Sequence, residues 1–77
     1  MKIQILGTGC PKCNQLYQNV QQAVDESGTD AVVEKVSDLN DIMALGVMVT
    51  PALVIDGQVK TSGKVPSAED IKKMFEQ

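Results

Sequence analysis

The spacing of apolar residues changes twice within the first 36 positions, and this constrains the fold more than any other feature. Residues 3–6 form a short apolar run that is typical of a strand. Across residues 13–24 the apolar side chains recur every three or four positions, which predicts one buried stripe of a helix ending near Gly28. Residues 31–36 predict a second strand. A crossover of this length makes the two strands parallel and the connection right-handed.

The second half of the sequence predicts four more elements. Asp38 is placed to cap a short helix over residues 39–45. Gly46 can adopt the left-handed conformation that ends such a helix. Residues 52–55 form an apolar run that predicts a strand, and a further strand follows it. Ser67-Ala68-Glu69-Asp70 matches a capping box and predicts a final helix.

The last two strands are predicted to form a hairpin. Asp56-Gly57 is the strongest two-residue signal for such a turn, and residues 58–62 then return as an antiparallel edge strand. Alternation along this strand places Val59 and Thr61 on the same face. The order of elements is therefore strand, helix, strand, helix, strand, strand, helix. Its most economical packing is an α/β domain with one mixed four-stranded sheet and helices on both faces.

Composition limits both the size of the domain and the chemistry available to it. The 77 residues predict a single domain over residues 1–77, with an aliphatic core because Tyr17 and Phe75 are its only aromatic residues. A net charge of −3 disfavours nucleic acid, and the absence of histidine excludes Cys/His zinc sites and hydrolase triads. Neither a secretion signal nor an apolar run long enough for a membrane span is recognisable, so we expect a cytoplasmic protein.

Cys10 and Cys13 are the only cysteines, and they follow the first predicted strand at the start of the first predicted helix. A disulfide between them would constrain very little of the unfolded chain, and the expected compartment does not favour structural disulfides. Unpaired amides and the helix dipole favour a thiolate at a helix start. The pair therefore predicts redox chemistry, with Cys10 as nucleophile and Cys13 as resolving thiol. Lys12 either favours the thiolate further or is simply solvated.

The order of elements, the Cys10-Pro11-Lys12-Cys13 motif after the first strand and Thr50-Pro51 at the third strand together resemble the thioredoxin fold. The chain is most similar to small glutaredoxin-like proteins of archaea and bacteria, the redox-active disulfide proteins. This resemblance covers essentially the whole chain. It implies the strand order 4-3-1-2 with strand 3 antiparallel, and a cis peptide bond before Pro51 that lies beside the cysteines.

The resemblance also implies an activity, thiol–disulfide oxidoreductase, with protein disulfides as substrates and an upstream disulfide reductase as electron donor. Thr50 and Pro51 are expected to line the substrate site, together with Gly9, Pro11 and Lys12. We expect a monomer with no metal and no cofactor beyond its own Cys10–Cys13 disulfide, and no nucleic acid or membrane partner. Residues 3–6 contain no acid, so the sequence does not identify an acceptor for the proton of Cys13.

Two other functions fit parts of the sequence. Two thiolates at a helix start also suit a carrier of Cu(I) or another soft metal. Small copper-binding domains, however, usually have methionine where this chain has Thr8, end in a strand, and lack the Thr50-Pro51 pair. The second alternative is a redox-sensing interaction module, which the residues alone do not distinguish from a reductase.

Overall fold

The structure is a computed structural model that describes residues 1–9 and 11–75. Its order of elements is the predicted one. Within the described residues, no helix is both long and apolar enough to cross a membrane. The elements are β1 (Lys2–Leu6), α1 (Pro11–Ser27), β2 (Val32–Val36), α2 (Leu39–Ala44), β3 (Ala52–Ile55), β4 (Gln58–Ser62) and α3 (Ala68–Phe75).

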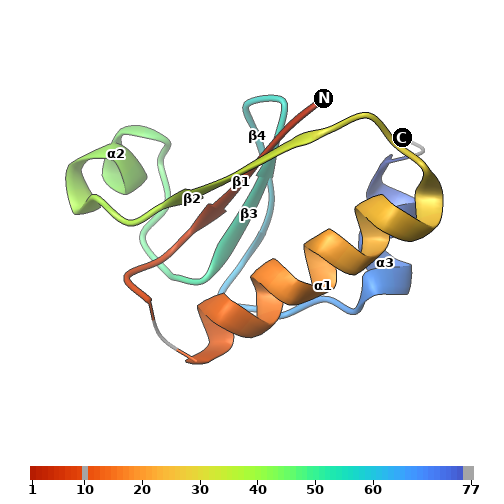
Figure 1. Cartoon of the computed structure of the whole chain (residues 1–77). Coiled ribbons are helices and arrows are strands. Elements are labelled where there is room, and N and C mark those ends of the chain that lie inside the picture. The colour runs from red at the N-terminus through yellow and green to blue at the C-terminus, as the bar shows by residue number, and fades with distance from the viewer. Residues whose placement is uncertain (10, 76–77) are drawn as a thin grey trace.

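The four strands form one mixed sheet in the order β2-β1-β3-β4 (Figure 1). β1 is parallel to β2 and antiparallel to β3, and β3 is antiparallel to β4. Ile5 in β1 is paired with Lys35 on one side and with Leu53 on the other. The fold class, the strand order 4-3-1-2 and the antiparallel direction of strand 3 are therefore confirmed.

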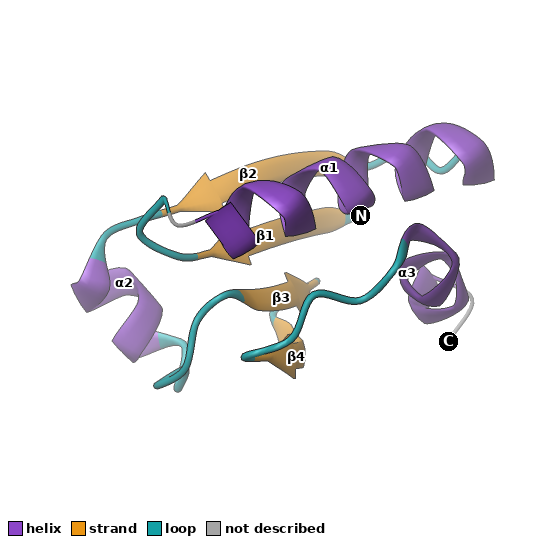
Figure 2. Cartoon of the chain, turned by 90° about the horizontal axis from the view of Figure 1, so that it is seen from below, coloured by secondary structure: helices purple, strands orange, loops and turns teal. Residues whose placement is uncertain are grey.

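Helices cover both faces of the sheet, as predicted, because successive side chains of a strand point to opposite faces. Figures 1 and 2 show α1 and α3 on one side of the molecule and α2 at the other. β3 is buried along its whole length, since its two faces contribute to two separate cores. The buried core of the α1/α3 face contains Ile3, Ile5, Leu16, Val20, Ala23, Leu53, Ile55 and Ile71. The buried core of the α2 face contains Leu6, Ile42, Val47, Ala52 and Val54.

Local polar contacts form at the predicted helix starts. The Asp38 carboxylate accepts a hydrogen bond from the Asn40 amide at 2.8 Å, and the Ser67 hydroxyl accepts one from the Asp70 amide at 3.2 Å. α1 and α3 are also joined at the surface, where Lys72 donates to Glu26 at 3.0 Å. Hydrogen bonds from the Gln22 and Lys72 side chains, with the positive charge of Lys72, lower the pKa of Glu26.

The β3–β4 hairpin has the predicted turn and the predicted edge strand, but not the predicted alternation along that strand. Asp56 and Gly57 have φ values of 50° and 82°, the positive values that a two-residue hairpin turn of this kind requires. The register then shifts by one residue, so that Val54 pairs with Val59 while Leu53 pairs with Thr61. The expectation that Val59 and Thr61 share a face is wrong, because this β-bulge breaks the alternation between them.

Candidate active site

Cys13 is the third residue of α1 and belongs to the apolar face of that helix, which packs against the sheet. It is 5% exposed, whereas its neighbours Lys12 and Asn14 are exposed. Burial follows from the helical spacing, since Cys13, Leu16 and Val20 are all buried residues of α1. The other half of the predicted pair, Cys10, lies outside the described residues.

Gly7, directly after β1, allows Cys13 to pack against the end of the sheet. A Cβ on Gly7 would overlap the Cys13 Sγ atom and lie 3.2 Å from the Cys13 Cβ atom. The Gly7 amide donates a hydrogen bond to the Val36 carbonyl at 2.9 Å, which fixes the backbone at this point. Sequence reasoning treated Gly7 only as the end of a strand and missed this role. A glycine between a strand and a buried cysteine was the available signal.

The peptide bond between Thr50 and Pro51 is cis, which confirms the geometry implied by the resemblance. The Thr50 Cβ atom lies 4.0 Å from the position that a Cβ on Gly7 would take, so Thr50 and Cys13 approach the same glycine. Pro51 is fully buried, and its carbonyl accepts a hydrogen bond from the Gly63 amide at 2.7 Å. The structure thus brings Thr50 and Cys13, 37 positions apart in the sequence, to one place.

Gly63, the residue after β4, is a second glycine that sequence reasoning missed. Its φ is 72°, a value that L side chains rarely adopt, and a Cβ on it would lie 2.8 Å from the Val49 Cγ1 atom. The hydrogen bond from Gly63 to Pro51 joins the end of β4 to the loop that carries the cis peptide bond, and the absence of a Cβ on Gly63 leaves room for Val49. The requirement for glycine arises from a contact between distant segments, so local turn patterns do not reveal it.

The other predicted site residues lie at the start of α1. Gly9 has a φ of 87° and is exposed, and it lines a cavity together with Cys13. Pro11 is the first residue of α1, where its fixed φ suits the helix and no amide is needed. Pro11 and Lys12 are both exposed, and neither lines that cavity.

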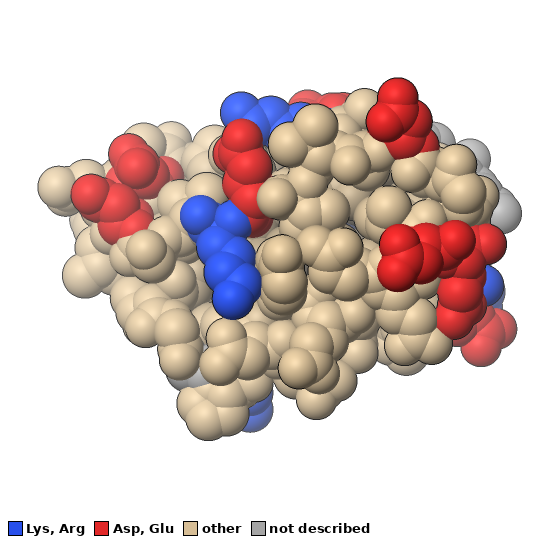
Figure 3. All heavy atoms as spheres, viewed as in Figure 1, with Lys and Arg blue, Asp and Glu red and all other residues tan. Residues whose placement is uncertain are grey.

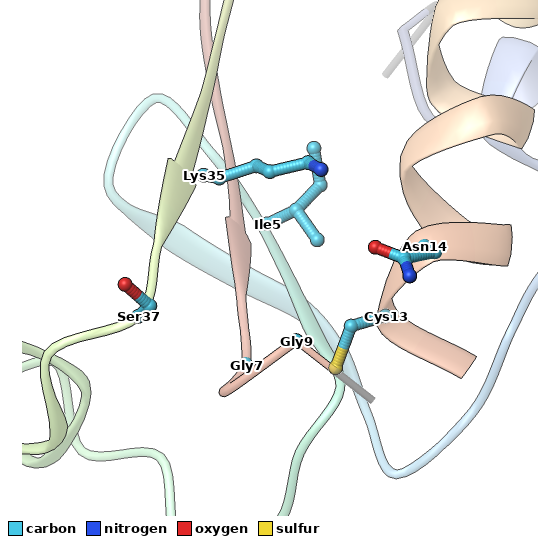
Figure 4. Close-up of a pocket in the computed structure, with 7 residues that line it drawn as sticks. All are labelled: Ile5, Gly7, Gly9, Cys13, Asn14, Lys35 and Ser37. Atoms are coloured by element: carbon cyan, nitrogen blue, oxygen red, sulfur yellow. The ribbon is translucent and has the colours of Figure 1, made fainter. Parts of the chain in front are cut away.

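This cavity has a volume of about 110 Å³ and lies between α1, β1 and β2. Figure 4 shows the Cys13 sulfur pointing toward Gly7 and Gly9, and the Lys35 side chain extending from β2 toward α1. The sequence did not reveal that Asn14, Lys35 and Ser37 line this cavity. Lys35 lies on the same face of the sheet as Ile5, because the two residues are paired in the parallel strands β1 and β2. The described residues that line the cavity are Ile5, Gly7, Gly9, Cys13, Asn14, Lys35 and Ser37.

Tyr17 is half-buried, packs against the α1/α3 core and is not part of the cavity wall. Its ring lies beneath the Lys35 ammonium, with 4.4 Å from Nζ to the ring centroid. Its hydroxyl accepts a hydrogen bond from the Gln21 side chain at 2.9 Å. Tyr17 therefore borders the site indirectly, through Lys35.

The surface near the cis peptide bond is apolar. Met48 is 94% exposed and Val49 is 56% exposed, both in the loop that leads to Thr50. Two residues of α2, Leu39 and Met43, are also largely exposed. Charged side chains are scattered over the face shown in Figure 3, with wide uncharged areas between them. Exposed apolar side chains next to a candidate site are typical of a surface that binds another protein.

The strand order, the position of Cys13 and the neighbouring cis-proline loop define a class of protein, the redox proteins of the thioredoxin fold. Comparisons with known proteins agree: residues 1–76 match the family model described as Thioredoxin domain. The chain belongs to this family and is a thioredoxin-like redox protein.

Two relatives from archaea extend this result. A protein named Thioredoxin from Methanocaldococcus jannaschii is 54% identical over 71 residues, which cover 92% of this chain and 81% of the relative. A second protein named Thioredoxin, from Methanothermobacter thermautotrophicus, is 46% identical over 75 residues, or 97% of each chain. The similarity therefore extends over nearly the whole chain and is not confined to the cysteine motif.

Proposed function

We propose that this protein is a thiol–disulfide oxidoreductase that reduces disulfides of other proteins through Cys10 and Cys13. The observation that carries the proposal is the position of Cys13, buried against Gly7 and beside the cis Thr50–Pro51 bond. The two relatives named Thioredoxin support the same activity. Membership of the thioredoxin domain family favours this activity over a Cu(I) carrier.

The proposed reaction has two exchange steps. The Cys10 thiolate attacks one sulfur of the client disulfide, so that a mixed disulfide forms and the second client sulfur leaves as a thiolate. Cys13 then loses its proton and attacks the Cys10 sulfur, which forms the Cys10–Cys13 disulfide and releases the first client sulfur as a thiolate. The client gains two electrons and the protein loses two. An upstream disulfide reductase returns them, and the proposed cycle uses the Cys10–Cys13 dithiol as its redox group.

The proposed client surface combines the predicted site residues with the apolar loop. Thr50 and Pro51 lie next to Cys13, and the exposed side chains of Met48 and Val49 continue this surface outward. Gly9, Pro11 and Lys12 form the opposite border at the start of α1. An extended apolar segment around a client disulfide suits such a surface, because burying Met48 and Val49 favours binding. The protein acts in this proposal as a cytoplasmic monomer, without nucleic acid or membrane partners.

Two serine variants test this proposal, each reduced beforehand and mixed with a protein disulfide substrate such as insulin. Mixed disulfides are trapped without free thiol, and turnover is measured separately with dithiothreitol as reductant. Cys13→Ser should accumulate covalent mixed disulfides, because its nucleophile acts but nothing resolves the product. Cys10→Ser should form no such complex and should lose turnover. Non-reducing electrophoresis detects the complexes, and loss of the bands on reduction is the control. Retention of disulfide reduction by Cys10→Ser would disprove the assignment.

A further inference from the structure

Met48 is the most exposed large apolar side chain among the described residues, at 94%. It lies in the loop between α2 and β3 (Figure 1), two positions before Thr50. Thr50 and Cys13 approach the same glycine, Gly7, so this loop borders the candidate site. Within the described part of the chain, almost none of the Met48 surface is covered. Its thioether is therefore open both to a bound client and to small reagents in solution.

The residues on either side of Met48 are held by packing. Val47 is 3% exposed and belongs to the core of the α2 face, and its amide donates a hydrogen bond to the Ile42 carbonyl at 3.3 Å. Val49 lies close to Gly63, since a Cβ on that glycine would be 2.8 Å from the Val49 Cγ1 atom. Because both neighbours are anchored, the loop keeps Met48 turned toward solvent.

The other methionines differ from Met48 in exposure or in position. Met43 is 68% exposed but lies in α2, outside the loop that carries the cis peptide bond. Met1 is 38% exposed, and Met74 is half-buried against the α1/α3 core. Accessibility therefore ranks the Met48 sulfur first, and Met48 is the methionine of the proposed client surface.

Oxidation of a methionine changes the character of its side chain. Hydrogen peroxide transfers one oxygen atom to the thioether sulfur, which loses two electrons, and the rest of the peroxide leaves as water. The resulting sulfoxide is polar and disrupts interfaces that bury methionine. At position 48 the sulfoxide would replace the apolar tip that a client is proposed to bury.

We propose that Met48 is an oxidative modification site: peroxide converts its thioether to the sulfoxide, and the sulfoxide weakens the binding of client proteins. This inference rests on the proposed function and adds an oxidant-sensitive group besides the dithiol. The two groups recover differently. Thiol exchange reverses the Cys10–Cys13 disulfide in each cycle, whereas the sulfoxide is reversed by dedicated sulfoxide reductases. Restoring the dithiol therefore does not restore client binding after Met48 is oxidised.

The first experiment maps the oxidation in the Cys10→Ser, Cys13→Ser double variant, which removes competing oxidation of the thiols. The folded variant is treated with limiting hydrogen peroxide, and tandem mass spectrometry of its peptides follows sulfoxide formation at each methionine. Met48 should be oxidised fastest, Met43 next and Met74 slowest, and the differences should vanish in concentrated urea. Faster oxidation of Met43 or Met74 than of Met48 in the folded protein would overturn the inference.

The second experiment measures insulin reduction after oxidation of Met48. The wild-type protein is treated with peroxide as its Cys10–Cys13 disulfide, which protects both sulfurs from higher oxidation. Catalase then removes the peroxide, and dithiothreitol is added as reductant. We expect kcat/KM to fall about tenfold, mainly through a higher KM, because the lost apolar contact contributes to binding rather than to the exchange steps.

Three variants identify the responsible sulfur. Met48→Leu keeps an apolar side chain that forms no sulfoxide, so peroxide should leave its kcat/KM at the value of the untreated variant. Met43→Leu is the matched control and should lose activity on treatment as the wild type does. Met48→Gln, with a polar side chain of similar length, should reproduce the loss without peroxide.

Equal losses in treated Met48→Leu and Met43→Leu would overturn the inference, as would full activity of wild-type protein that carries the Met48 sulfoxide. A wild-type protein that fails to reduce insulin before treatment would instead refute the proposed function. The mapping experiment needs no substrate, so it decides in either case whether Met48 is the site that peroxide modifies first.

Discussion

The chemistry of this site depends on two residues without side chains as much as on its sulfur. Because Gly7 has no Cβ, the Cys13 sulfur can pack against the end of β1. Because Gly63 has no Cβ, the Val49 side chain fits beside it in the cis-proline loop. Both glycines are therefore steric requirements of the site. They act on the two segments that meet there, the start of α1 and the loop before β3.

Gly7→Ala should destabilise the protein and impair the redox site together. The added methyl group overlaps the Cys13 sulfur, and such overpacking of a tight core costs about 1–3 kcal/mol in the free energy of unfolding. Urea denaturation under reducing conditions measures this loss. In the Cys13→Ala background the sulfur is absent, so Gly7→Ala should cost clearly less there. Equal costs in both backgrounds would show that the sulfur contact is not the cause.

Site residues were predictable from the sequence where a local motif marks them, and were missed where their role depends on contacts between distant segments. Cys13, Thr50 and Pro51 were identified from their motifs. The structure places Cys13 and Thr50 next to Gly7, and a cis peptide bond joins Thr50 to Pro51. Gly7, Gly63 and Lys35 were missed, because their importance depends on which distant segments touch them. The prediction for Cys10 remains a prediction, since that residue lies outside the described part of the chain.

At the scale of elements, Asp56 joins the turn of the β3–β4 hairpin to the start of β1 through its side chain and its backbone. The Asp56 carboxylate accepts a hydrogen bond from the Lys2 amide at 2.8 Å, and the Asp56 amide donates to the Lys2 carbonyl at 2.8 Å. Asp56 also has a positive φ of 50°, which aspartate and asparagine tolerate better than most residues. The turn therefore sets both the hairpin and its attachment to β1.

Replacing Asp56 by alanine should remove the side-chain hydrogen bond and leave a residue that disfavours positive φ. We expect the free energy of unfolding to fall by about 1–2 kcal/mol. Asp56→Asn keeps an acceptor oxygen and tolerates the same backbone, so it should lose less than about 0.5 kcal/mol. Chemical denaturation of both variants compares them directly. If asparagine were as harmful as alanine, the charge of Asp56 would matter more than its geometry.

For the whole molecule, the order of elements and the sheet topology were predictable because they follow from apolar periodicity and from the short connections. The β-bulge that separates Val59 from Thr61 was not, since β4 is a largely exposed edge strand and no buried face specifies its register. The division of the interior into two cores also follows from the alternation in β3, whose Leu53 and Val54 face opposite helices. A sheet covered on both faces in a chain of 77 residues leaves each core small.

Small cores make the protein sensitive to single truncations, and Ile71 in α3 tests this. Ile71 is fully buried in the core that also holds α1, so Ile71→Ala should cost about 2–5 kcal/mol. Domains of this kind have total stabilities of about 5–15 kcal/mol, so the loss is a large share. Met43→Ala, at a side chain that is 68% exposed, should change stability by less than about 0.5 kcal/mol. Urea denaturation measures both. Because α3 packs on the helix that carries Cys13, Ile71→Ala should also expose the Cys13 thiol to alkylation, whereas Met43→Ala should not. An equal rate of Cys13 alkylation in the two variants would show that α1 keeps its position without α3.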